Sequence, residues 1–175
     1  MNLLLIGPLT DKVIPLCGNC HSIKKAKIFK EFEKIISSPN LFKLSAEQIE
    51  NFIKEAINDH PNYSSIKEYK RNVKVQIKKY IRKRFVYEQL FNGRCIGCGK
   101  ITAYNNLPAL ELHHRTPEIL EVKSTWSDLS NMDCEEIFRK TLKENCVCLC
   151  ANCHTLTRSK LHSYCKEIFD NTNRD

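Results

Sequence analysis

The pattern of hydrophobic and polar positions predicts a chain that is mostly helical. Residues 24–37 and 41–59 each place apolar side chains on one side of a helix. Ser45 and Gln48 form a capping box that would begin the second of these helices. A third segment, over residues 65–92, alternates apolar residues with lysines and arginines at helical spacing. These segments predict a helical body in the first half of the chain.

The second half of the chain contains two short strand patterns as well as helices. Residues 108–114 and 145–150 each predict a short strand, and a charged helix is predicted over residues 133–143. Because neighbouring side chains in a strand point to opposite faces, His113 and His114 must differ in role. Apolar residues at helical spacing then predict a last helix from residue 151 onward.

Four cysteines form two pairs with two residues between the members, Cys95 with Cys98 and Cys150 with Cys153. Each pair can form a tight knuckle, and two knuckles complete a closed tetrahedral shell around one ion. We therefore expect these thiolates to hold a structural zinc ion; the alternative is buried thiols or disulfides. The apolar start of the chain lacks a charged leader. We expect a protein that is not secreted and lies in the cytoplasm or another reducing, intracellular compartment.

Histidines accompany the cysteine pairs. His113 and His114 end the first predicted strand, Asn145 begins the second, and His154 follows the last cysteine of the second pair. This arrangement resembles the HNH nucleases, specifically those whose ββα-metal motif is clamped by a four-cysteine zinc. The resemblance covers roughly residues 90 to 162. It implies an α+β fold, mainly helical, in which a C-terminal ββα-metal module follows the helices.

The resemblance also implies hydrolysis of phosphodiester bonds with one divalent cation, Mg²⁺ or Mn²⁺. His113 and His154 would ligate this cation, and His114 would be the general base that takes a proton from the attacking water. Asn145 would hold in place the strand that carries His114. Elementary chemistry agrees with this assignment, because a cation neutralises an anionic phosphodiester and a neutral imidazole is a suitable base near neutral pH.

The chain departs from the family pattern in two places. Many relatives have another histidine one helical turn after the position of His154, where this chain has Arg158. Arginine cannot ligate a cation but can bind a phosphate. Either the cation keeps an extra water, which we favour, or His162 substitutes. The second departure is a long insert between His114 and Asn145, which a subset of the family shares.

The charge of the chain favours an anionic partner. Its 175 residues carry a formal net charge of +8, and many of the cations lie in the predicted helix over residues 67–84. We expect this helix to follow nucleic-acid phosphates without base preference; the alternative is an ordinary solvated lysine face. The residues predicted to contact nucleic acid are Lys74, Lys78, Arg82, Arg115 and Arg158.

A second copy of the cysteine-pair pattern lies near the start of the chain, where Cys17 and Cys20 are followed by His21. It lacks an upstream cysteine pair and an upstream histidine pair, so we do not expect it to be catalytic. Cys17 and Cys20 would need partners to hold a second zinc ion. The candidates are Cys134, Cys165, His21, another subunit or sequence outside this chain, and spacing favours none of them. A pair of buried thiols is the alternative.

The patterns divide the chain into a partial CxxCH motif with a helix (1–40), a region with the basic helix (41–90) and an HNH nuclease domain (91–170). We expect a metal-dependent endonuclease of double-stranded DNA, restriction- or homing-like, that would cut both strands most simply as a homodimer. The alternative is a zinc-stabilised nucleic-acid-binding protein whose histidines have no catalytic role. No apolar run has membrane length, so no membrane partner is expected.

Overall fold

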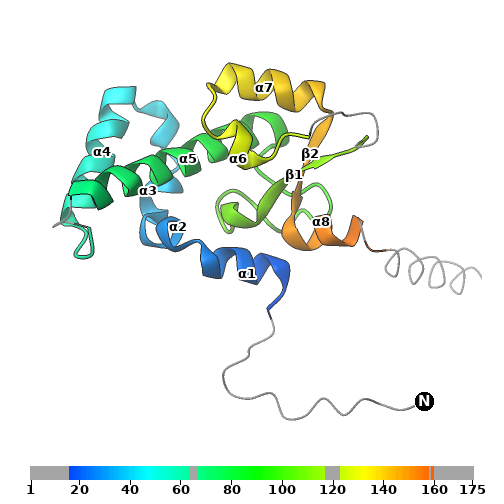
Figure 1. Ribbon diagram of the computed structural model, residues 1–175, viewed down its shortest axis with the longest axis horizontal. Helices are drawn as coiled ribbons and strands as arrows, with labels where there is room; N and C mark the ends of the chain where they lie inside the picture. The colour runs from blue at the N-terminus through cyan, green and yellow to red at the C-terminus, as the bar shows by residue number, and fades with distance from the viewer. Residues whose placement is uncertain (1–15, 64–66, 117–122, 158, 160–175) are drawn as a thin grey trace, which may run out of the picture.

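The computed structural model describes residues 16–63, 67–116, 123–157 and 159. In this part of the chain the architecture is α+β and mainly helical, with one two-stranded sheet (Figure 1). The α-helices are α1 (Gly18–Lys25), α2 (Lys27–Glu31), α3 (Glu33–Ile36), α4 (Ala46–Asp59), α5 (Lys67–Phe91), α6 (Trp126–Leu129), α7 (Cys134–Lys143) and α8 (Ala151–Thr157). The strands are β1 (Leu110–His114) and β2 (Cys146–Cys150), and short 3₁₀ turns lie at η1 (Leu41–Lys43) and η2 (Leu107–Ala109).

The sheet pairs β1 with β2 in antiparallel register, so that Leu110 lies opposite Cys150 and His114 lies opposite Cys146. Alternation along β1 buries Leu110 and Leu112, whereas Glu111 and His113 are partly exposed. Helix α8 begins directly where β2 ends and packs against both strands. Strand, strand and helix therefore form one compact unit at the right of Figure 1.

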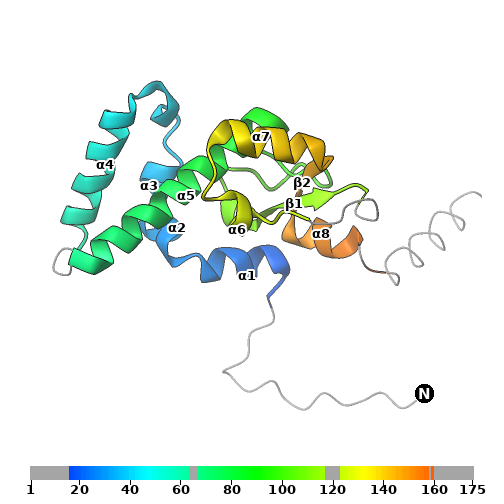
Figure 2. The same cartoon turned by 45° about the horizontal axis from the view of Figure 1, so that its top comes forward.

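Helix α5 connects this unit to the rest of the molecule. Its first half pairs with α4 in an arm at one end of the molecule, and its second half reaches the sheet (Figure 2). Its apolar stripe is buried, as the helical spacing predicts, and comprises Val73, Ile77, Ile81, Val86 and Tyr87. The helix ends at Asn92 and Gly93, which adopt φ angles of 53° and 60°. This left-handed conformation stops the helix just before the first cysteine knuckle.

The capping box predicted for α4 is present. The Gln48 N–H donates to Ser45 Oγ at 3.2 Å, and the Ser45 N–H donates to Gln48 Oε1 at 2.8 Å. Helix α7 has a comparable start, where the Glu136 N–H donates to Asp133 Oδ1 at 2.8 Å. The predicted start of the third helical segment, at residue 65, lies outside the described residues.

The single helix expected over residues 24–37 is wrong in detail, because three short helices occupy this region. The chain turns at Ala26, where ψ is 65°, and again at Phe32, where φ is −115°. These bends let Phe29 and Ile36 reach the core beside α5, where both side chains are fully buried. Helical periodicity identifies which side of a segment is apolar, but it does not reveal bends that tertiary packing imposes.

The last predicted helix is present as α8 up to Thr157, and its expected continuation over residues 160–169 lies outside the described residues. Over the described ranges, no helix combines the length and the apolar character needed to cross a membrane.

Candidate metal centre and the adjacent histidines

The two predicted cysteine knuckles come together between the end of α5 and the start of α8. The Sγ atoms of Cys95, Cys98, Cys150 and Cys153 all lie within 4.8 Å of one another, and those of Cys98 and Cys150 are 3.9 Å apart. Four sulfurs that each lie about 2.3 Å from a tetrahedral ion would be separated by about 3.8 Å. The four thiols therefore have the spacing needed to hold a metal ion.

Main-chain hydrogen bonds shape the first knuckle. The Gly99 N–H donates to the Cys95 carbonyl at 2.9 Å, and the Ile96 N–H donates to the Cys148 carbonyl of β2 at 3.0 Å. Gly97 lies against the other knuckle, because a Cβ atom at this position would be 3.0 Å from Cys153 Sγ. The tight approach favours glycine at this position and brings one cysteine pair against the other.

Electrostatics favour a bound cation in this group. Burial raises the pKa of the Cys98 thiol, but the N–H groups of Ile101 and Lys100 and the neighbouring thiols outweigh burial and bring the pKa to about 7. Burial and the neighbouring thiols raise the pKa of Cys153 far above its ordinary value. Ionisation of one thiol therefore makes ionisation of the next less favourable. A bound divalent cation would offset this repulsion between the thiolates.

His113 and His154 lie together beside the cysteine cluster, one on β1 and one on α8. Their ring centroids are 5.1 Å apart, with an angle of 78° between the ring planes. Glu111, two residues before His113, lies on the same face of β1 and places Oε2 2.5 Å from His154 Nδ1. The two predicted cation ligands are thus brought together with a carboxylate that sequence reasoning did not single out.

The contact with Glu111 determines which nitrogen of His154 can act as a ligand. With Nδ1–H donating to the carboxylate, Nε2 keeps its lone pair. His154 Nε2 is buried and has no hydrogen-bond partner among the described residues. A buried acceptor without a partner is costly, whereas an imidazole oriented by a carboxylate is a common metal ligand. The geometry of His154 therefore fits a cation ligand.

His114 points to the opposite face of β1 from His113, as strand alternation predicts. Its Nε2 lies 2.8 Å from Oε2 of Glu144, the residue that caps the C-terminus of α7. Ser124 donates its N–H to Glu144 Oε2 at 3.0 Å and its hydroxyl to Glu144 Oε1 at 2.6 Å. Glu144 would hold the ring with Nε2 as the donor, which leaves Nδ1 free to accept a proton.

Burial alone would raise the pKa of Glu144. The hydrogen bonds from Ser124 and the interaction with His114 outweigh burial, so the pKa lies below its ordinary value. The carboxylate therefore stays ionised at neutral pH. Ligand atoms of His114, Glu144 and Cys146 also lie within 4.8 Å of one another, so this group too could hold a metal ion.

Asn145 occupies the turn between α7 and β2 with a φ of 48°. Its carbonyl accepts a hydrogen bond from the Arg115 N–H at 3.2 Å, so the main chain of this turn is tied to the end of β1. The structure places Arg115 at the exposed end of β1, next to His114. Arg158 and His162 both lie outside the described residues.

The N-terminal cysteine pair packs directly on α8. Asn19 and Asn152, which occupy equivalent positions in the two knuckles, exchange hydrogen bonds: the Asn19 N–H donates to Asn152 Oδ1 at 3.2 Å and the Asn152 N–H donates to Asn19 Oδ1 at 3.1 Å. Cys17 and Cys20 are exposed, with Sγ atoms 3.3 Å apart.

No third ligand accompanies Cys17 and Cys20 within the described ranges. His21 and Cys134, two of the predicted partners, are therefore not close enough to complete a site with this pair. Cys165, the third intramolecular candidate, lies outside the described residues.

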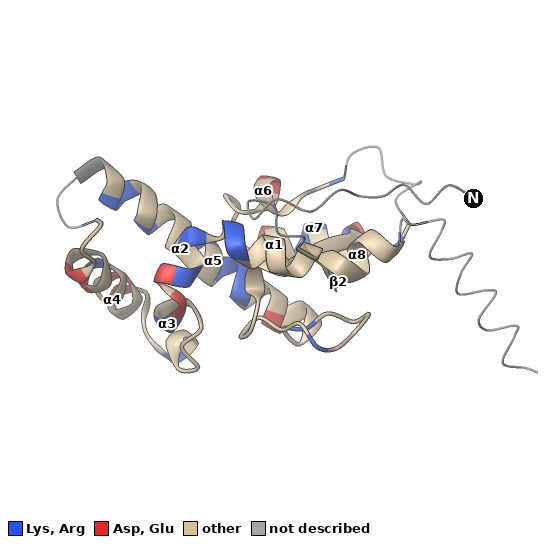
Figure 3. Ribbon diagram, turned by 90° about the horizontal axis from the view of Figure 1, so that it is seen from below, with Lys and Arg blue, Asp and Glu red and all other residues tan. Residues whose placement is uncertain are grey.

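The basic helix α5 uses several of its cations in tertiary contacts. Lys74 and Lys78 both pair with Glu50 of α4, with Lys78 Nζ 2.6 Å from Oε2, and they lower the pKa of Glu50 to about 2. Arg82 Nη1 donates to the Ser130 carbonyl at 2.6 Å. Figure 3 shows further cations on α5 and on the neighbouring α2. The three predicted nucleic-acid contacts on this helix thus also join α5 to α4 and to the end of α6.

Comparisons of the chain with protein-family models, with curated proteins and with solved structures give no match. The function is therefore argued from the residues and their geometry.

Proposed function

We propose that this protein is a metal-dependent endonuclease that hydrolyses phosphodiester bonds of DNA. The observation that carries the proposal is the approach of His113 and His154 from β1 and α8, with the buried and unpartnered Nε2 of His154. Two imidazoles and a nearby carboxylate are a suitable partial ligand set for a divalent cation that keeps positions open for substrate oxygens. The arrangement agrees with the HNH-like pattern of the sequence.

The four-cysteine group would hold zinc in this proposal, because a closed shell of thiolates suits zinc and leaves no position for a substrate. Its role would be structural: it would fix the chain before β1 to the end of β2 and the start of α8. His154 lies next to Cys153, so the same ion would position His154 relative to His113.

His113 and His154 would hold Mg²⁺ or Mn²⁺, which when bound neutralises the charge on the scissile phosphate. Glu111 would orient His154 by accepting its Nδ1–H. His114, at the end of β1, would accept a proton from water at Nδ1 while Glu144 keeps Nε2 as the donor. Because His113 and His114 lie on opposite faces, cation and base would approach the substrate from two sides of the end of the strand.

A plasmid-cleavage assay tests this proposal. Purified protein incubated with supercoiled plasmid and Mg²⁺ or Mn²⁺ should convert it to nicked or linear DNA, and His114→Ala should lower the rate by about 100-fold or more. His60→Ala is the matched control, because His60 packs against Phe32 and Tyr63 in a different part of the molecule and should leave cleavage unchanged.

Two results would refute the catalytic role. One is a plasmid that stays intact both with Mg²⁺ and with Mn²⁺. The other is equal cleavage by wild type and by His114→Ala. Retained DNA binding without cleavage would instead support the alternative, a zinc-stabilised nucleic-acid-binding protein. Tight zinc and unchanged folding in His114→Ala would show that any loss of rate is chemical.

A further inference from the structure

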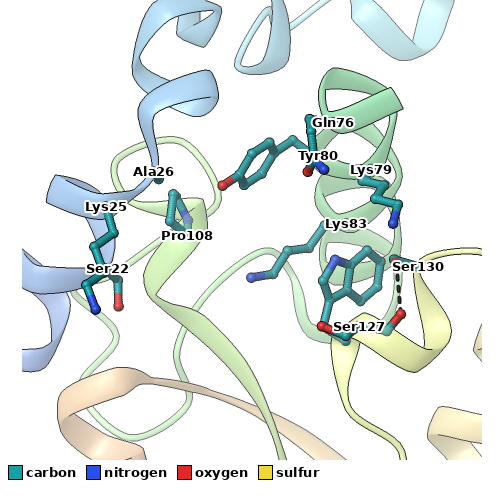
Figure 4. A pocket seen from close by; sticks show the side chains of 11 residues that line it. Ser22, Lys25, Ala26, Gln76, Lys79, Tyr80, Lys83, Pro108, Ser127 and Ser130 are labelled. Atoms are coloured by element: carbon teal, nitrogen blue, oxygen red, sulfur yellow. Dashed lines mark hydrogen bonds between the residues drawn. The ribbon is translucent and has the colours of Figure 1, made fainter. Parts of the chain in front are cut away.

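A cavity of about 460 Å³ lies outside the histidine cluster, between α1, α5, η2 and α6 (Figure 4). Its walls come from segments far apart in the sequence, so tertiary packing builds it. A volume of this size is typical of sites that bind small organic ligands. The lining residues include three lysines and no aspartate or glutamate. The cavity therefore combines the dimensions of a ligand site with a positive charge.

Lys83 is a buried lysine in the wall of this cavity. Its side chain extends from α5 into the space facing Pro108 (Figure 4), and the residue is only 6% exposed. None of the ion pairs formed among the described residues includes Lys83. Its ammonium lies 5.4 Å from the centre of the Tyr87 ring, which only partly replaces lost water. Burial outweighs the more distant interactions of Lys83 with Cys148 and Glu111, so a buried ammonium without a direct ion pair remains unfavourable and a bound anion would relieve this cost.

Lys25 and Lys79 add two further positive charges to the walls of the cavity, one from α1 and one from α5. Burial lowers the pKa of Lys83 to about 8, so this group still carries most of its charge at neutral pH. Figure 4 shows the Lys83 ammonium between those of Lys25 and Lys79, so a phosphate at Lys83 would have positive charge on both sides. The charge of the cavity thus selects an anion rather than a neutral ligand.

The remaining wall is aromatic. Trp126 and Tyr80 both line the cavity and are partly exposed. Trp126 is held edge-on against Tyr87, with ring centroids 5.9 Å apart, and the hydrogen bond from Arg82 to Ser130 anchors the end of α6. Aromatic side chains beside cations are the usual means of binding a nucleobase and its phosphate together.

We propose that this cavity binds a nucleoside phosphate, with the phosphate at Lys83, attracted also by the charges of Lys25 and Lys79, and the base against Trp126 and Tyr80. A free nucleotide and the phosphorylated end of a nucleic-acid strand share this chemistry. The site goes beyond the nuclease function and does not depend on it, because it requires neither the histidines nor a divalent cation.

The only tryptophan of the chain lies in this cavity, so its fluorescence reports binding directly. Titration of the full chain with AMP, without divalent cations, should change the tryptophan emission at a concentration of about 1 mM or below. Adenosine should bind about tenfold more weakly or worse, because it lacks the phosphate. The second arm of the experiment uses oligonucleotides with a 5′-phosphate or a 5′-hydroxyl. Binding of AMP would show that the ligand is a free nucleotide. Binding of the phosphorylated oligonucleotide alone would show that the ligand is the end of a strand.

Lys83→Met keeps the length of the side chain and removes its charge, and it should weaken AMP binding about tenfold or more. Lys34→Met is the matched control, because Lys34 is exposed on α3 and does not line the cavity. The double variant Lys25→Gln with Lys79→Gln changes no buried group and leaves Lys83 in place, and it should also weaken AMP binding. Absence of a fluorescence response to both AMP and the phosphorylated oligonucleotide would overturn the proposal. So would equal AMP affinity in wild type and in the double variant.

Discussion

Lys83 carries a charge into a nearly closed environment, and this location could not be inferred from the sequence. Its helix alternates cations with apolar residues, which predicts a solvated basic face. Whether one particular lysine of that face is covered depends on α1 and α6, which reach α5 through tertiary packing. Local periodicity therefore identified the helix but not the buried cation.

The buried charge predicts a pH-dependent stability difference between wild type and Lys83→Met. Burial lowers the pKa of Lys83 in the folded protein to about 8, partly offset by Cys148 and Glu111, whereas in the unfolded chain it should be near 10.4. Below pH 8 the Lys83 amine is protonated in both the folded and the unfolded chain, so the full cost of burying the charge is present. Between about pH 8 and 10.4 only the unfolded chain holds it, so the free energy of unfolding of wild type should rise relative to the variant.

Thermal unfolding at several pH values measures this effect. At pH 7 Lys83→Met should have the higher Tm, and its advantage should shrink as the pH approaches 10. Lys34→Met, which removes an exposed charge, should show no such trend. A Tm difference between Lys83→Met and wild type that stays constant over this range would contradict a desolvated ammonium.

The histidine site was partly predictable at the level of single residues. His113 and His154 are brought together as the sequence suggested, and Glu111 had a readable signal, because residues two apart in a strand share a face. Glu144 had no such signal. It lies 30 residues from His114 in the sequence, and only the packing of α7 beside the sheet places its carboxylate there.

The sequence predicted the positions of the helices and strands that have a clear periodicity. The start of α4, the long α5, the two strands and the beginning of α8 all lie close to their predicted positions, since each has a clear periodicity or an end signal. The sequence did not predict the division of the region before α4 into α1, α2 and α3, because its two bends depend on packing against α5. The positive φ angles of Asn92 and Gly93 explain why α5 ends at Phe91, one residue before its predicted end.

Glu144 joins three elements of the structure. It caps α7, holds His114 of β1 and accepts two hydrogen bonds from Ser124 ahead of α6. Glu144→Gln keeps the shape but removes the charge that orients His114. We expect the rate constant for DNA cleavage to fall by about 10- to 100-fold with little change in KM.

Two comparisons separate this positioning role from a general loss of structure. Glu135→Gln, an exposed carboxylate on the same helix, should cleave at the wild-type rate. The zinc content and the far-UV circular dichroism of Glu144→Gln should equal those of wild type. An unchanged cleavage rate in Glu144→Gln would mean that Glu144 does not orient the base.

For the molecule as a whole, the four-cysteine cluster joins segments more than 50 residues apart in the sequence. With the proposed zinc ion bound there, treatment with a strong chelator should lower the Tm by about 10 °C or more, because crowded thiolates would remain without a cation. Added zinc should restore the Tm, whereas added magnesium should not, because magnesium prefers oxygen ligands. Metal analysis that finds no tightly bound ion in folded protein would contradict the structural role.

The paired asparagines at the two knuckles affect the order in which the chain can be assembled. Asn19 and Asn152 are 133 residues apart, so the knuckle of Cys17 and Cys20 rests on a helix that is synthesised much later than the knuckle itself. On the ribosome, α1 must wait with two exposed thiols until α8 emerges. Docking of α1 therefore has to follow the synthesis of α8, and oxidation of Cys17 and Cys20 during that interval is the hazard that a reducing environment would prevent.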